Sequence, residues 1–184
     1  MRIGIVVLTA SLVVLPLFAF QRGGAPAPEP PEQTTEGGPF APFEDLLGSW
    51  RGIGKGKLGD EHVERQFYVV LGGAFLQSQT RTVAKRSIHE DLGMLSFDKS
   101  RGLFVMREFQ SEGVYNQYTI ELQDGGKTIV MTTEAIENPV APGVRLRQTL
   151  KFVGEDELLD TLEVKVGDEP WELSIESTLK RSPD

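Results

Sequence analysis

The stretch "GSWRGIGKGK", residues 48–57, decides between two folds. Three glycines alternate with other residues behind Trp50, a pattern that also suggests a phosphate-binding loop. Such a loop places its glycines at a turn between a strand and a helix, and no helical pattern follows here. Because the period is two, we interpret the stretch as a β-strand. Its two faces carry Trp50, Gly52, Gly54 and Gly56 on one side and Arg51, Ile53, Lys55 and Lys57 on the other.

The glycine face of this strand has two interpretations. If it points inward, it allows a sharp bend and leaves volume where side chains would otherwise stand, which favours an internal cavity. Alternatively, the glycines only admit close packing from neighbouring strands, with no cavity. The sequence leaves both open.

The rest of the chain repeats the period-two pattern between turn residues. Connections such as "QDGGK", residues 123–127, and "VGDEP", residues 166–170, hold the glycines and aspartates that tight hairpins require. Consecutive hairpins pair neighbouring strands, and closing the sheet removes both exposed edges. We therefore predict an all-β fold, a ten-stranded antiparallel up-and-down barrel. Its strands are expected at residues 50–57, 62–70, 74–83, 88–97, 103–110, 114–122, 128–133, 144–153, 158–166 and 171–180.

The last predicted strand indicates which residues face the interior. Its apolar face carries Trp171, Leu173, Ile175 and Leu179, and the same parity continues to Arg181. Because a closed barrel brings the last strand beside the first, Arg181 is expected to stack on Trp50. Such a cation–π contact contributes about 0.5–2 kcal/mol.

Residues 1–20 have the layout of a secretory signal, with Arg2 followed by an apolar run. Cleavage after Ala19 is one prediction, and an uncleaved membrane anchor is the alternative. Residues 21–42, rich in proline and glycine, are predicted to be a disordered linker. The barrel domain is then 43–184, and "FEDLLG" at its start is expected to form a short helical plug. The protein is thus expected to be periplasmic or extracellular.

Composition excludes several classes of partner and site. The net charge is −8, and removing the leader with Arg2 takes it to −9, so nucleic acid and anionic lipid are not expected partners. The chain has no cysteine, hence no disulfide and no thiolate metal site. The carboxylates of "GEDELLD", residues 154–160, lack the spacing of a calcium loop. No metal site is predicted, and the oligomeric state stays open.

Two motifs carry a resemblance to known barrels. Gly48-x-Trp50 at the first strand, with a basic residue closing the last, resembles the calycin group of lipocalins and fatty-acid-binding proteins. The longer string "LLGSWRGIGKG" resembles the opening of nitrobindin-like, haem-binding barrels and of related uncharacterised bacterial barrels, and His89 and Gly93 keep a His-x-x-x-Gly spacing found there. The resemblance implies a barrel with one open mouth and an apolar cavity. In nitrobindins it also implies haem with an axial histidine near the chain end, but this chain's histidines are His62 and His89.

The middle strands mix aromatic and polar residues, as small-molecule cavities do. Candidate ligand contacts there are His89, Met106, Arg107, Tyr115 and Tyr118. The alternative is that the tyrosines only cover a barrel wall. At "HED", strand geometry allows His89 with Asp91, or Glu90 alone, to face inward; a mixed surface strand near the mouth is the other interpretation.

Three functions follow from these patterns. The first is an exported, non-catalytic barrel that holds an apolar or amphipathic small molecule, without a cofactor. The second is a haem-binding, nitrobindin-like peroxynitrite isomerase with His89 as the best remaining imidazole. The third is a structural or interaction module without a ligand. No Gly-x-Ser-x-Gly motif or other hydrolase signature occurs, so no residue is assigned a catalytic role.

Overall fold

The computed structural model describes residues 38–57, 59–85, 87–139 and 141–183. The predicted signal at 1–20 and residues 21–37 of the predicted linker lie outside this part of the chain. Within the described residues, no helix is both long and apolar enough for a membrane span.

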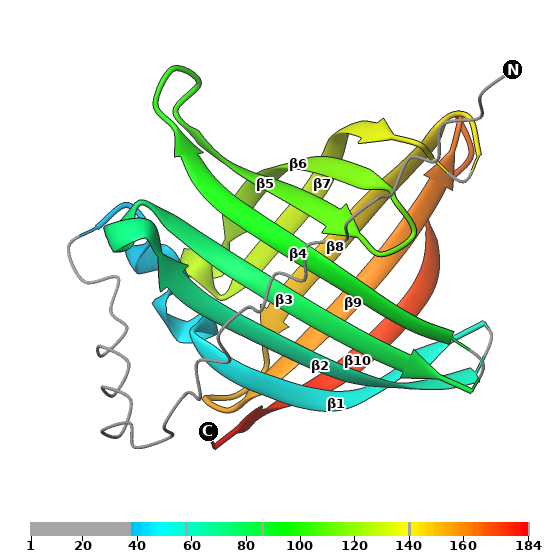
Figure 1. Cartoon of the computed structure of the whole chain (residues 1–184), viewed down its shortest axis with the longest axis horizontal. Helices are drawn as coiled ribbons and strands as arrows, with labels where there is room; N and C mark the ends of the chain where they lie inside the picture. The colour runs from blue at the N-terminus through cyan, green and yellow to red at the C-terminus, as the bar shows by residue number, and fades with distance from the viewer. Residues whose placement is uncertain (1–37, 58, 86, 140, 184) are drawn as a thin grey trace, which may run out of the picture. The chain divides into compact units, whose positions relative to one another are not determined.

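Ten antiparallel strands form a closed barrel in which each strand pairs with its neighbours in sequence and β1 pairs with β10 (Figure 1). The predicted up-and-down barrel is therefore confirmed. The strands are β1 (Gly48–Gly56), β2 (Gly59–Val70), β3 (Phe75–Ala84), β4 (Ser87–Asp98), β5 (Leu103–Gln110), β6 (Tyr115–Gln123), β7 (Thr128–Glu137), β8 (Val144–Phe152), β9 (Glu157–Val166) and β10 (Glu172–Ser182).

Two hairpins at one end of the barrel turn through short 3-10 segments. These are η2 (Leu71–Gly73) and η3 (Asp124–Gly126), and each contains a glycine with a left-handed backbone, Gly72 at φ 67° and Gly125 at φ 69°. A side chain at either position would be strained. The "QDGGK" stretch thus supplies the turn residues that its position requires.

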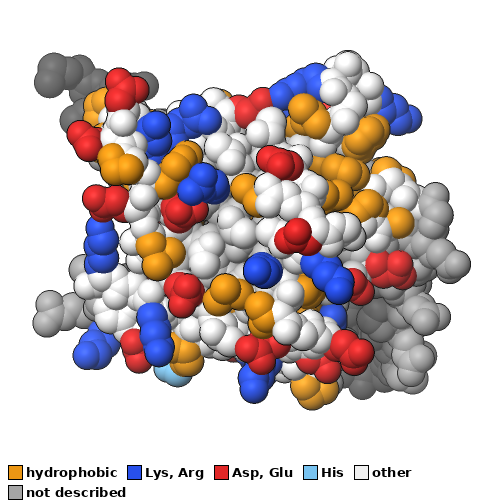
Figure 2. Space-filling view, turned by 180° about the vertical axis from the view of Figure 1, so that it is seen from behind, with side chains coloured by type: hydrophobic (Ala, Val, Ile, Leu, Met, Phe, Trp, Pro, Cys, Tyr) orange, Lys and Arg blue, Asp and Glu red, His pale blue; other side chains and the backbone are white. Residues whose placement is uncertain are grey.

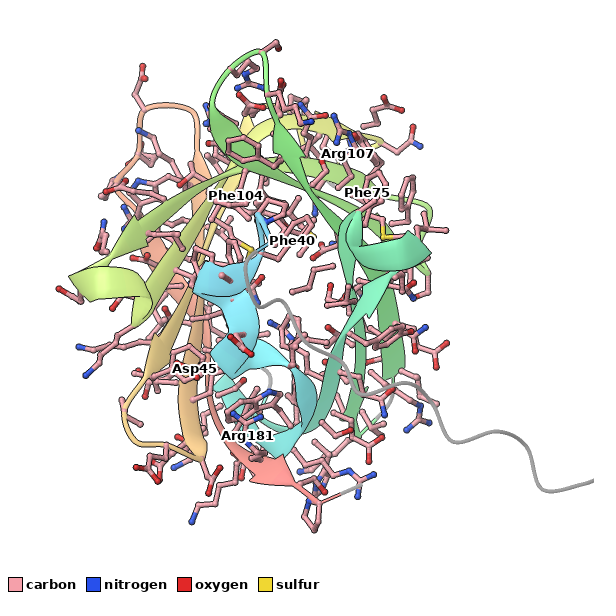
Figure 3. All side chains as sticks on the ribbon, turned by 90° about the vertical axis from the view of Figure 1, so that its left-hand side faces the viewer. Phe40, Asp45, Phe75, Phe104, Arg107 and Arg181 are labelled. Carbon is pink, nitrogen blue, oxygen red and sulfur yellow. The ribbon has the colours of Figure 1, made fainter. Side chains whose placement is uncertain are left out.

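A third 3-10 helix, η1 (Ala41–Leu46), lies against this same end, where β1 begins and β10 ends. Phe43 and Leu46 are buried in the main hydrophobic cluster, and Figure 3 shows η1 in front of the barrel interior. Trp50, fully buried, donates from Nε1 to the Leu46 carbonyl oxygen at 2.8 Å. These contacts hold η1 against the hydrophobic cluster at this end of the barrel.

Arg181 fastens η1 to the barrel wall. Its guanidinium lies 4.4 Å from the centre of the Trp50 ring, the stacking expected from strand parity. Nη1 donates to the Leu47 carbonyl oxygen at 2.6 Å and Nη2 to that of Asp45 at 2.9 Å (Figure 3). Arg181 therefore links the C-terminal strand of the domain to its N-terminal segment.

The glycines of β1 face inward but do not leave the hollow that one interpretation predicted. A methyl group on Gly52 would lie 1.9 Å from the Thr178 carbonyl oxygen, and one on Gly54 would lie 2.7 Å from Ser177 Oγ. Neighbouring strand β10 occupies the space in front of them. Close packing, the alternative interpretation, is the one the structure supports.

The inward assignment of Trp171 and Leu173 is wrong. The β9–β10 register shifts between Leu173 and Ile175, which marks an irregularity of the β-bulge type. This inverts the faces before the bulge: Leu173 is 51% exposed, and Trp171 lies against the Arg147 guanidinium at 4.6 Å. Beyond the bulge, Ser177 and Leu179 are buried as the inward parity requires.

Charges of both signs are interspersed over the face of the molecule that Figure 2 displays. Over the outer wall of the barrel, several charges pair across neighbouring strands, such as Arg51 with Glu64 at 3.5 Å and Arg147 with Glu163 at 2.6 Å. Pairing of this kind limits any strong single-sign field on that surface.

Candidate functional site

A cavity of about 350 Å³ occupies the barrel interior. Residues from β2–β6 and β8–β10 line it, whereas no residue of the fully described strand β1 does. Glu61, Ala84 and Ser87 place one side of it beside the β1–β2 and β3–β4 turns. The cavity therefore reaches the end of the barrel opposite η1.

A layer of polar residues forms the floor of this cavity. Its members also line a second, apolar cavity of about 20 Å³ next to Phe43 and Leu46. We call this set the polar layer, and it consists of Arg65, Thr80, Asp91, Glu108 and Gln148. On the η1 side of this layer the barrel is filled by hydrophobic side chains, and on the other side lies the 350 Å³ cavity.

Arg65 stands in the polar layer with acidic neighbours. Its Nη1 is 3.0 Å from Asp160 Oδ2, and Gln148 Nε2 donates to Asp160 Oδ1 at 2.9 Å. Burial alone would lower the pKa of Arg65, but attraction by Asp160, Asp91 and Glu108 raises it. The guanidinium is thus a permanent cation inside the barrel.

Glu108 is held by neutral donors. Gln110 Nε2 at 2.8 Å, Asn116 Nδ2 at 3.3 Å and the Tyr118 hydroxyl at 3.3 Å all reach its Oε1 atom. Desolvation raises the pKa of Glu108, and the nearby charge of Asp91 raises it further, against the hydrogen bonds and Arg65. Burial also raises the pKa of Tyr118 well above its usual value, so its hydroxyl stays protonated.

His89 lies above the polar layer between two carboxylates. Nδ1 is 2.9 Å from Glu112 Oε2, in the β5–β6 connection, and Nε2 is 3.7 Å from Asp91 Oδ2. Hydrogen bonding to Asp91, opposed by burial and supported by Glu112, raises the pKa of His89 to about 9. The imidazole is therefore cationic at neutral pH.

The residues present do not fit imidazole-ligated haem. An axial histidine must be neutral and offer one ring nitrogen to iron, whereas both nitrogens of His89 face carboxylates. His62 lies on the outer face of β2, exposed and opposite Ile53. Among the described residues, no three His, Cys, Asp or Glu side chains are grouped to hold a metal ion.

The structure separates the predicted ligand contacts into two groups. His89 and Tyr118 line the 350 Å³ cavity, and Met106 lines the smaller one. Arg107 and Tyr115 lie on the outer face instead: Arg107 donates to Ser96 Oγ at 3.2 Å, and the Tyr115 ring packs on exposed Phe109 at 5.2 Å. Adjacent residues of a strand point to opposite faces. A run of consecutive candidate residues therefore includes some that face the cavity and some that face outward.

Three residues of the site, Arg65, Glu108 and Gln148, were not identified from the sequence, and Asp160 was considered only among the carboxylates of residues 154–160, although it is buried. A signal was nevertheless present. Arg65 stands between Val63 and Phe67, and Asp160 between Leu158 and Leu162, at the parity of buried apolar residues. A charge at such a position is an inward-facing charge.

Comparison with known proteins finds solved structures of similar fold but identifies no family. No known family model matches the chain, and no curated protein matches it significantly. The crystal structure of Rv2717c from M. tuberculosis is similar, with a TM-score of 0.62 and 22% identity over 78% of this chain and 97% of that one. At this identity the likeness shows the barrel fold alone.

Two further solved structures align less well. The S-type phycobiliprotein lyase CPES from Guillardia theta has a TM-score of 0.49 and 12% identity over 77% of this chain and 91% of its own. EF1p2_mFAP2b bound to DFHBI has a TM-score of 0.38 and 13% identity over 75% and 94%. All three align with most of the barrel domain.

Proposed function

We propose that this protein is an exported binding barrel that holds an amphipathic small molecule in the 350 Å³ cavity. The cavity itself carries the proposal, since it lies in the range of small-molecule sites and combines an apolar wall with a polar floor. Val63, Leu146, Leu162 and Ile175 supply the apolar wall. The polar layer would orient the ligand's head group.

Binding without chemistry is the simplest use of this site. Two ion pairs at the cavity fix charged side chains: Arg65 of the polar layer pairs with Asp160, and His89 pairs with Glu112. A rigid, preformed pocket favours affinity, because little side-chain freedom is lost on binding. The export part of the proposal rests on the sequence of residues 1–20 and is tested by N-terminal sequencing of protein recovered from its host.

The binding proposal is tested with 1-aminoanthracene, a neutral fluorophore that brightens in apolar cavities. We expect saturable fluorescence with the wild-type protein. Thr82→Trp, which adds bulk on the cavity wall, should abolish it, while Gln79→Trp, three residues earlier on the outer face of β3, should leave it unchanged. Equal fluorescence from both variants, or none from the wild type, would refute an internal binding site.

A further inference from the structure

The floor of the cavity carries two acidic side chains on adjacent strands. In the β4–β5 register, Asp91 lies opposite Gln110, and Glu108 lies opposite Gly93. Asp91 and Glu108 are therefore diagonal neighbours on the inner face, a separation of about 7–8 Å between backbones that side chains readily bridge. Two like charges so close repel each other, unless a proton or a cation lies between them.

Both carboxyl groups keep acceptor oxygens available to the cavity. The Asp91 side chain is only 8% exposed, and its one partner among the described residues is His89, whose Nε2 lies 3.7 Å from Oδ2, so Oδ1 stays without a hydrogen bond from these residues. All three donors to Glu108 reach Oε1, which leaves Oε2 without a hydrogen bond from the described residues. Neither residue contributes an atom to the fully buried side-chain atoms without a partner, and both residues line the cavity. A buried carboxylate without partners is costly, so a ligand that donates to it gains affinity.

The cations already present are each shared with another carboxylate. Arg65 forms its close contact with Asp160, and His89 forms its shortest contact with Glu112. Four carboxyl groups line the cavity, namely Glu61, Asp91, Glu108 and Asp160, against the two cations Arg65 and His89. An anionic head group, such as that of a fatty acid, could reach Arg65 only beside these four carboxyl groups, which would repel it.

We propose that the cavity selects an organic cation, whose ammonium group donates hydrogen bonds to Asp91 and Glu108 while its apolar part lies against Val63, Leu146 and Leu162. This inference rests on the proposed binding function and names the ligand class. Charge-assisted hydrogen bonds of this type are among the stronger polar contacts in proteins.

The test uses three probes with the same eight-carbon chain and different head groups: n-octylammonium, 1-octanol and octanoate. Each is titrated against bound 1-aminoanthracene at neutral pH and low salt. We expect octylammonium to bind about tenfold or more tightly than octanol, and octanoate to bind most weakly. Equal affinities, tighter binding of octanoate, or no displacement by octylammonium would overturn the cation inference. The fluorophore signal itself tests the binding function separately.

Two variants assign the selectivity to this pair. Glu108→Gln and Asp91→Asn should each weaken octylammonium binding about tenfold while octanol binding changes less than about twofold. Retained octanol binding also shows that the variant is folded. The control, Glu90→Gln, removes a carboxylate of equal charge from the outer face of β4, where Glu90 pairs with Arg81. If the control weakens octylammonium as much as the two inner variants do, general surface charge and not this site attracts the cation.

Discussion

Replacing Gly52 by alanine tests why the first strand is so rich in glycine. The added methyl group would lie 1.9 Å from the Thr178 carbonyl oxygen and 2.8 Å from its carbon. Both are backbone atoms of β10, and Gly52 pairs with Leu179 in the β1–β10 ladder, so no side-chain rotation relieves the clash. Overpacking in a core costs about 1–3 kcal/mol. Because here the barrel's closing seam must move, we expect a loss of about 3 kcal/mol or more for Gly52→Ala.

Two other glycines provide the matched comparison. At Gly54 the nearest atom to an added methyl is Ser177 Oγ at 2.7 Å, a side chain that can move. Gly54→Ala should therefore cost about 1 kcal/mol, and Ser177→Ala in the same chain should recover much of it. At Gly154 only Glu157 Cβ lies near, at 3.8 Å. Gly154→Ala should be neutral or stabilise by about 0.4–1 kcal/mol.

The assay is urea unfolding followed by circular dichroism, with the free energy of unfolding taken from midpoints at an unchanged m-value. The expected order of stability is Gly154→Ala, then Gly54→Ala, then Gly52→Ala. If Gly52→Ala lies within about 0.5 kcal/mol of Gly154→Ala, close approach of β10 does not explain the glycines of β1.

Three further perturbations probe the contacts of Arg181 with η1, the His89–Glu112 pair and the polar layer by the same unfolding assay. Arg181→Lys should lower stability by about 1–2 kcal/mol, because an ammonium cannot stack on Trp50 and donate to two carbonyl groups at once. An unchanged urea midpoint would mean that the guanidinium group is not needed there. The effect of Glu112→Gln on stability depends on pH, because folding raises the pKa of His89 from its ordinary value of 6.5 to about 9. The charged imidazole therefore stabilises the fold fully below pH 6.5, and this stabilisation is lost as the pH rises through about 9. The loss in this variant should therefore be greatest near pH 6 and vanish near pH 10, and a constant loss would contradict the ion pair. Arg65→Met leaves buried carboxylates without their cation and should lower stability by about 3–5 kcal/mol at neutral pH, with a smaller loss at acidic pH, where carboxylates become protonated. A variant more stable than the wild type would show that the Arg65–Asp160 pair serves binding and not stability.

The strand number and order could be predicted from sequence because both depend on local features. Period-two patterns and turn residues occur within windows of ten residues, and an up-and-down order adds no long-range choice. Boundaries shifted by a few residues, as at β2, predicted from 62 and observed from Gly59. The conformation of β7 past residue 133 was missed, since "TEAIE" alternates only weakly.

Two features could not be predicted because their causes are not local. The bulge in β10 depends on how β9 meets it, and nothing in "WELSIES" marks the position where the faces invert. The face of β4 that points inward was also undecided, since His89, Glu90 and Asp91 are all polar. In the structure, His89 lies opposite Thr82 and Asp91 lies opposite Gln110, and all four residues line the cavity.

The polar layer shows why a barrel site is harder to recognise than a barrel. Its charged members Arg65, Asp91 and Glu108, and Asp160 beside them, come from β2, β4, β5 and β9, and no two are close enough in sequence to form a motif. Each is an isolated charge at an inward position. Burying such a charge alone costs several kcal/mol, so its presence in a stable barrel requires a partner from another strand, a bound ligand, or both. Arg65 and Asp160 have each other. Asp91 shares His89 with Glu112, and Glu108 has no ion pair among the described residues, and for that reason they are where a ligand is expected.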